Sequence, residues 1–148
     1  HDFISSMNDC LPQGMLITEA SEYLGNQSVP SMVCSQVYRF IITHDNPTSV
    51  DETINSLPGL LQNDYVITRE KKKKNKLIRK ELNVTSYISE IELIGTNQLD
   101  VEIRIVIQVS DSGSLKVEEV KNFIYNSLSG ITGIEIQRTA LNFIDKVI

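Results

Sequence analysis

The sequence predicts an α+β domain in which an antiparallel sheet carries its helices on one face. Valine and isoleucine concentrate in short runs between polar turns, and segments with helical spacing of apolar residues separate these runs. One run, from Leu99 to Val109, alternates apolar and polar side chains along its length. Such alternation is typical of an antiparallel strand with one buried and one open face. The chain has 148 residues, 41% of them apolar, which suits one folded domain with a sizeable core.

A short helix and a short strand are expected in the first part of the chain. Phe3, Ile4 and Met7 recur at helical spacing, which indicates a helix over residues 2–9. The apolar residues at 15–17 predict a short buried strand.

The first long strand is expected over residues 35–43, because Tyr38, Phe40 and Ile42 fall on one face and Arg39 on the other. This strand ends at a turn whose sequence is His-Asp-Asn-Pro.

A helix is expected after this turn. Ser49 and Glu52 have the spacing of a capping box, and Pro58-Gly59 ends the helix. His44 belongs to the turn, so we interpret it as turn chemistry rather than as a metal ligand.

Two hairpins are expected next. In the first, a strand over 65–68 leads into the lysine run, which forms the exposed tip and returns from Leu77. In the second, residues 87–94 pair with the alternating strand Leu99–Val109 across a tight connection. The outer face of this second hairpin carries Glu90, Glu92, Asp100 and Glu102. These acids are either a pair for acid–base chemistry or an ordinary solvated face.

The last helix and strand complete the pattern. Ser114 is expected to cap the helix, which ends before Gly130. The inner stripe of this helix is expected to contain Val117, Val120, Phe123, Ile124 and Leu128. The final strand is expected to bury Ile134, Ile136, Leu141 and Phe143. The two halves, strand-helix-hairpin and then hairpin-helix-strand, indicate two ferredoxin-like half-units.

Positive charge is concentrated in one segment. Residues 69–80 contain eight Lys or Arg and one Glu, a net charge of +7, whereas the rest of the chain carries −12 and the whole chain −5. An acidic protein with one basic element is expected to meet an anionic partner there.

Single-stranded RNA is the partner that this segment suits, because cations can neutralise phosphates while aromatic rings stack on bases. The candidate RNA-binding residues are Arg69, Lys71, Lys72, Lys73, Lys74, Lys76, Arg79, Lys80, Tyr65 and Tyr87. The alternative is a solvated hairpin tip at 69–80 that binds nothing.

Other function classes find no support in the sequence. Cys10 and Cys34 are too few to hold an iron–sulfur cluster, and no catalytic serine motif is present, so we expect no metal, no cofactor and no catalysis by this chain alone. Two unpatterned cysteines, with no export signal and no long apolar span, favour a cytoplasmic protein that does not enter a membrane.

Arg138 shares the strand parity of Ile134 and Ile136, so it is expected to face the packed side of the sheet. A buried guanidinium needs a partner, and Glu118 or Glu119 is the expected one. A ligand contact is the alternative.

Several segments resemble a bacterial family of unknown function, the radical-SAM-linked proteins. They include VITREKKKKNK at Val66–Lys76, NVTSYISEIEL at Asn83–Leu93, GSLKVEEV at Gly113–Val120 and QRTALNF at Gln137–Phe143, whose Arg138-Thr139 matches a family motif. The N-terminal part of that family has no counterpart here. Residues 1–148 are therefore expected to be one domain or the C-terminal portion of a larger one.

The resemblance and the basic segment at 69–80 together indicate three alternative functions. The first is a non-catalytic accessory module that presents RNA or a ribonucleoprotein substrate to a partner enzyme. The second is a protein-interaction module that docks a radical-SAM protein through a sheet edge or the long alternating strand. The third is part of an RNA-modifying enzyme whose site is shared with the missing N-terminal region.

Overall fold

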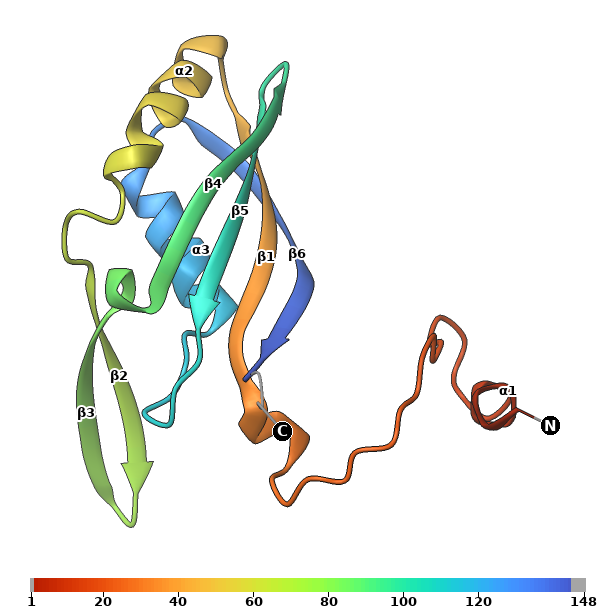
Figure 1. The fold of residues 1–148 in the computed structure, drawn as a ribbon. Coiled ribbons are helices and arrows are strands. Elements are labelled where there is room, and N and C mark those ends of the chain that lie inside the picture. Colours follow the sequence, from red (N-terminus) through yellow and green to blue (C-terminus); the bar gives the residue numbers. More distant parts are fainter. Residues whose placement is uncertain (1, 145–148) are drawn as a thin grey trace. The chain divides into compact units, whose positions relative to one another are not determined.

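The computed structural model describes residues 2–144 and confirms the α+β fold (Figure 1). The chain divides into two compact units, His1–Ser31 and Met32–Ile148. A 3₁₀ turn, Val29–Met32 (η1), leads into the first strand. Every strand of the described residues belongs to the larger unit.

The smaller unit contains one short helix, as expected. Helix α1 spans Phe3–Asn8. The strand expected over 15–17 is wrong, because these residues are irregular and Leu16 is 71% exposed. The Asn8 side chain accepts the N–H of Ile17 at 2.7 Å and donates to its carbonyl at 3.0 Å. A side chain thereby satisfies the backbone groups that a strand would have paired.

Four antiparallel strands form the main sheet of the larger unit, in the spatial order β4-β5-β1-β6. The strands span Val33–His44 (β1), Ile88–Asn97 (β4), Asp100–Gln108 (β5) and Ile131–Phe143 (β6). In the centre of the sheet, Phe40 of β1 lies opposite Ile103 of β5 and Ile136 of β6. The long alternating strand is therefore an inner strand, which rules it out as a docking edge.

Two helices cover one face of this sheet, as expected (Figure 1). Helix α2 spans Pro47–Ser56 and continues as a 3₁₀ turn, Leu57–Gly59 (η2), while α3 spans Val117–Ser127. The side chains buried between helices and sheet include Phe40, Ile42, Val50, Leu57, Val101, Ile103, Ile105, Ile107, Val120, Phe123 and Ile124. Burying each of them contributes about 1.5 to 3 kcal/mol, so this layer dominates the stability of the domain.

The connectivity is ferredoxin-like once one hairpin is set aside. The main sheet and its helices follow the chain order β1-α2-β4-β5-α3-β6, a βαββαβ unit with β5 and β1 in the centre. The strands β2, Val66–Lys73, and β3, Lys76–Asn83, form a separate two-stranded sheet inserted between α2 and β4. The basic hairpin is therefore an addition to a complete fold.

Both helices begin differently from the expectation. The cap of α2 is Asn46, whose side-chain oxygen accepts the Ser49 N–H at 2.9 Å, so a capping box at Ser49 is wrong. The cap position of α3 is Lys116 rather than Ser114. There the Glu119 carboxylate accepts the Lys116 N–H at 2.8 Å, which satisfies a backbone donor that the helix leaves unpaired.

The end of β6 is more exposed than expected. Ile134 and Ile136 pack against the core, as predicted, but Leu141 and Phe143 are 36% and 44% exposed. Both lie beyond the part of the sheet that the core layer covers, on the outermost strand. Alternation along a strand predicts which side chains share one face of the sheet, whereas burial of these side chains also requires that another layer covers that face.

His44, expected in a turn, is the last residue of β1 and is 1% exposed. Its Nε2 lies 2.7 Å from Thr53 Oγ1 on α2, and its Nδ1 lies 3.1 Å from the carbonyl of Leu99. Both ring nitrogens are satisfied within the fold, so this side chain ties α2 to the start of the β5 region. Among residues 2–144 no group of three His, Cys, Asp or Glu side chains could hold a metal ion.

Gly130 allows the chain to turn between α3 and β6. Its φ is +69°, and a Cβ there would collide with Ser49 Oγ and come within 2.6 Å of Asp45 Oδ1. We expect Gly130→Ala to lower the free energy of unfolding by about 2 kcal/mol or more, because strain and collision add. Urea unfolding followed by circular dichroism measures this loss.

Gly133→Ala is the matched control, because this glycine lies in β6 and a Cβ would meet nothing within 4 Å. Its effect on the free energy of unfolding should stay below about 1 kcal/mol. Equal losses in the two variants would contradict the role given to Gly130.

Candidate nucleic-acid interface

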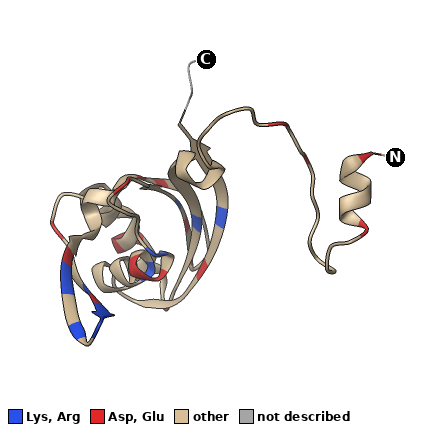
Figure 2. Ribbon diagram, turned by 90° about the horizontal axis from the view of Figure 1, so that it is seen from below, with Lys and Arg blue, Asp and Glu red and all other residues tan. Residues whose placement is uncertain are grey.

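The basic segment forms a regular hairpin of two exposed strands. β2 and β3 pair from Val66 opposite Asn83 to Lys73 opposite Lys76. Lys74 and Asn75 make the turn, with φ values of +45° and +63°, as a two-residue hairpin connection requires. Three of the four consecutive lysines therefore lie along the strand, and only Lys74 lies in the turn. Figure 2 shows how strongly Lys and Arg concentrate on this hairpin.

The two faces of the hairpin carry different side chains, because successive residues of a strand point to opposite sides. The face that we call the inner face contains Ile67, Arg69, Lys71 and Lys73 of β2 with Leu82, Lys80, Ile78 and Lys76 of β3. The outer face contains Thr68, Glu70 and Lys72 with Glu81, Arg79 and Leu77. On the outer face Arg79 donates to Glu70 at 2.9 Å, so part of the charge there is compensated.

Arg69 fixes the inner face to the start of α3. Its guanidinium donates to both carboxylate oxygens of Glu119, at 2.7 and 2.6 Å, and to the carbonyl of Ser114 at 2.8 Å. Such a bidentate, charge-assisted contact is among the stronger polar interactions in proteins. Hydrogen bonding from Arg69 lowers the pKa of Glu119, against a smaller opposing effect of burial, and Glu119 in turn raises the pKa of Arg69. Arg69 is thus a structural cation of the hairpin.

The base of the hairpin joins the hydrophobic core. Leu82 and Val84 are 5% and 0% exposed, and the 3₁₀ turn Val84–Tyr87 (η3) then leads into β4. The Asn83 side chain accepts the N–H of Tyr65 at 3.1 Å, which closes the entry and exit of the hairpin against each other.

The two candidate stacking tyrosines lie at this base. Both are partly buried against the core. The Tyr65 ring meets Phe123 edge to face, with centroids 5.1 Å apart, and its hydroxyl accepts Asn126 Nδ2 at 2.8 Å. Tyr87 is close enough to Arg69 to contribute to its raised pKa. Tyr65 and Tyr87 therefore both lie at the base, with Tyr87 near Arg69, while the lysines extend beyond the base.

The family-motif residues lie elsewhere. Arg138 is opposite Tyr38 on the edge strand β6, and both it and Thr139 are exposed. The expected buried ion pair of Arg138 with Glu118 or Glu119 is wrong: Glu119 binds Arg69, and Glu118 binds Lys121 at 3.3 Å. The Thr139 hydroxyl donates to the carbonyl of Val37 at 3.3 Å.

The four outer-face acids of β4 and β5 are held by neighbours rather than set up for proton transfer. Their partners are Arg39 for Glu102 at 2.6 Å, Arg104 for Glu90 and Glu92 at 3.0 and 3.5 Å, and Thr43 for Asp100 at 2.6 Å. Hydrogen bonding from Arg39 lowers the pKa of Glu102, so this carboxylate stays ionised. The arrangement fits a charge-paired open face.

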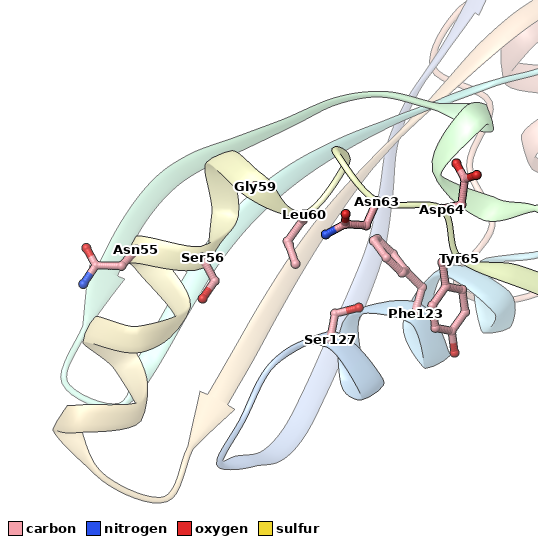
Figure 3. Close-up of a pocket in the computed structure, with 9 residues that line it drawn as sticks. All are labelled: Asn55, Ser56, Gly59, Leu60, Asn63, Asp64, Tyr65, Phe123 and Ser127. Carbon is pink, nitrogen blue, oxygen red and sulfur yellow. The ribbon is translucent and has the colours of Figure 1, made fainter.

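A hollow lies between the end of α2 and α3 (Figure 3). It measures about 390 Å³, and Asp64 is the one charged side chain among the residues that line it. Ser56 Oγ donates to Glu52 O at 2.7 Å and Asp64 accepts Asn83 Nδ2 at 2.8 Å, while the Asn55 amide points away from Phe123. Polar groups do not converge here on a ligand position, so we regard the basic hairpin as the better candidate site.

Comparison with protein families identifies the family to which the chain belongs. A family model described as "uncharacterized protein conserved in bacteria" (DUF2344) matches residues 1–117. The chain belongs to this bacterial family. No curated protein matches the sequence. The match covers the basic hairpin, the main sheet up to β5 and the capping residue of α3.

Sequence reasoning missed two residues of this DUF2344 member that shape the interface. Glu119 is expected to pair only with Arg138, and Lys116 is expected to have no role, because no local pattern connects residues 50 positions apart such as Arg69 and Glu119. One signal was present: an acid at the third position of a helix is the residue type that caps the first turn.

None of the helices among residues 2–144 is long and apolar enough to cross a membrane.

Replacing Glu119 should loosen the hairpin and remove part of the acid sensitivity of the fold. Its pKa is lower in the folded than in the unfolded chain, so its stabilisation is present above the unfolded value of about 4.3 and is lost as pH falls through the folded value. We expect Glu119→Gln to lower the free energy of unfolding by about 1 to 3 kcal/mol at pH 7, with a smaller loss below pH 4. Urea unfolding at several pH values measures both effects.

Glu118→Gln is the control, because Glu118 meets only Lys121, at 3.3 Å on the helix surface. Faster amide hydrogen exchange along β2 and β3 should appear in Glu119→Gln and not in Glu118→Gln. Unchanged exchange in both would argue against Arg69 as the residue that fixes the hairpin.

Proposed function

We propose that this protein is a non-catalytic accessory module that binds single-stranded RNA, free or in a ribonucleoprotein, and presents it to a partner enzyme. The observation that carries the proposal is the projecting β2–β3 hairpin, where eight of the fourteen basic residues lie between Arg69 and Lys80. The hairpin is inserted into a fold that is complete without it. Only the base of the hairpin, with Leu82, belongs to the core, so folding does not account for the exposed lysines beyond it, and their concentration supports a partner.

Electrostatics would confine RNA to this hairpin. The rest of the chain carries −12 and repels phosphate, while Lys71 to Lys74 and Lys76 are all exposed. Basic residues bind the RNA backbone without base specificity, and each phosphate contact to a single strand adds about 0.7 to the salt dependence of the binding constant. The position of the two tyrosines at the hairpin base is consistent with stacking on the bases of an RNA strand, although the Tyr65 ring already contacts Phe123.

The partner enzyme in this proposal is a radical-SAM protein, on the strength of the family resemblance. Such an enzyme would supply the cluster chemistry that Cys10 and Cys34, both unpaired thiols, cannot support here. Free thiols also fit a cytoplasmic site of action.

Removing the four consecutive lysines should weaken RNA binding without unfolding the domain. We expect the variant with Lys71 to Lys74 changed to Ser to bind bulk single-stranded RNA at least about tenfold more weakly at low salt, with a salt slope smaller by about 2 to 3. Filter binding from 25 to 200 mM salt measures both quantities. If the natural protein shows no binding at the lowest salt, the proposal fails.

The control changes net charge by the same amount at four positions outside the hairpin. It replaces Gln62, Asn122, Ser129 and Gln137, all exposed, by Glu. This variant should retain most of its affinity and its full salt slope. An equal loss in both variants would show that net charge alone governs binding.

A second candidate function, docking of a radical-SAM protein through a sheet edge, is favoured by one observation. Leu141 and Phe143 are 36% and 44% exposed on β6, which is an edge strand. An open edge next to exposed apolar side chains suits addition of a partner strand.

This second function predicts that Leu141→Lys with Phe143→Glu prevents co-purification of a co-expressed radical-SAM protein, whereas loss of the four lysines does not. Tyr125→Lys is the control, since Tyr125 is 56% exposed on α3. Co-purification that survives the β6 changes would exclude this edge as the docking surface.

A further inference from the structure

A basic hollow lies between the inner face of the hairpin and the start of α3. It measures about 500 Å³ and is lined by Arg69, Glu70, Lys71, Ile78, Lys80 and Lys116. Four of these six residues are cations, and they come from two strands and from the residue that precedes α3. The hollow between α2 and α3, by comparison, contains no basic side chain.

Three of the four cations are uncompensated. Arg69 is neutralised by Glu119, and Glu70 by Arg79. Within the described part of the chain, the ammonium groups of Lys71, Lys80 and Lys116 form no ion pair, although Lys116 is near enough to help lower the pKa of Glu119. The hollow therefore carries excess positive charge in a protein whose net charge is −5.

The strand register brings like charges together on the inner face. Lys80 is directly opposite Arg69, and Lys71, opposite Ile78, is the next inner-face residue along β2. Like charges opposite one another destabilise a strand pair. Glu119 already balances the charge of Arg69, whereas Lys71 and Lys80 form no ion pair with the described residues, so an anion bound between these two ammonium groups would remove the repulsion between them.

The helix dipole of α3 is not the source of this site. Glu118 and Glu119 occupy its first turn, and the Lys116 N–H is already bound by Glu119. Binding here would depend on lysine ammonium groups, which act as flexible point charges toward phosphate.

We propose that this hollow binds the phosphorylated 5′ end of an RNA strand. A terminal phosphomonoester carries nearly two negative charges at neutral pH, twice the charge of an internal phosphodiester, and it therefore matches a cluster of three free ammonium groups better. The hollow is larger than phosphate alone and falls in the size range of small-ligand pockets, so a terminal nucleotide fits, with its sugar and base against Ile78 and the lysine stems. This inference rests on the proposed RNA function and assigns the hollow to the end of the strand.

The test compares one oligoribonucleotide in two forms, with a 5′-phosphate or a 5′-hydroxyl and a fluorescent label at the 3′ end. Fluorescence anisotropy should show about tenfold tighter binding of the phosphorylated form. Lys80→Gln and Lys116→Gln should each bring the ratio of the two affinities close to one. A ratio of one in the natural protein, or a ratio that neither variant changes, would overturn the proposal.

Two controls separate the hollow from the hairpin as a whole. Lys72 lies on the outer face, so Lys72→Gln should weaken the binding of both RNA forms equally and leave the ratio of the two affinities unchanged. Lys121→Gln, on α3 and paired with Glu118, should change neither affinity. Thermal unfolding of each variant within a few degrees of the natural protein confirms that the exposed changes leave the fold unaltered.

Titration with adenosine 5′-monophosphate and with adenosine, followed by NMR of the amides from Ser114 to Glu119, distinguishes this inference from the RNA function. One outcome is that adenosine 5′-monophosphate, but not adenosine, shifts these amide signals while neither RNA form binds. This outcome would overturn both the RNA function and the RNA end as ligand, and a free mononucleotide would then be the occupant of the hollow. RNA binding with no nucleotide shifts and no 5′ preference would uphold the RNA function and overturn this inference.

Discussion

The contact of Glu119 with Arg69 and with the Lys116 backbone holds the unusual part of this molecule in place. One carboxylate completes the first turn of α3 and at the same time binds the guanidinium that fixes the hairpin. An isolated two-stranded hairpin has marginal stability in water, and this one also carries repelling lysines. Its order therefore depends on Ile67, Leu82 and Arg69 at the end nearest the core, with the Arg69 contact the farthest from the base.

This arrangement divides the larger unit into a part whose charges are mostly paired and a part whose charges are mostly unpaired. The βαββαβ unit buries its aliphatic side chains between one sheet face and two helices and uses its outer charges in ion pairs. The hairpin leaves most of its charges unpaired. Unpaired like charges repel one another, so their location on an inserted element keeps this repulsion away from the core layer.

Local patterns predicted most of the fold. The alternation from Leu99 to Val109 and the apolar stripe of α3 reflect burial by a single neighbouring layer, which sequence parity reports well. The failures share a different cause. Met15 to Ile17, Leu141 and Arg138 have the expected local pattern, but their burial depends on whether another element covers them. The basic hollow combines residues of the hairpin with Lys116, which is far away in the sequence, so no local pattern could predict it. The segment 69–80, in contrast, could be proposed as an RNA-binding segment from its charge alone.

The two-residue turn at Lys74 and Asn75 has a consequence for how such a site can change. The turn fixes the register, so the odd residues of β2 and the even residues of β3 share the inner face. Deleting one residue from either strand would exchange the two faces beyond that point. The composition would stay almost the same while the basic cluster was dispersed. Two chains with equal numbers of lysines in this segment would then present different charges on the face toward α3, so hairpin length as well as lysine count determines the basic cluster.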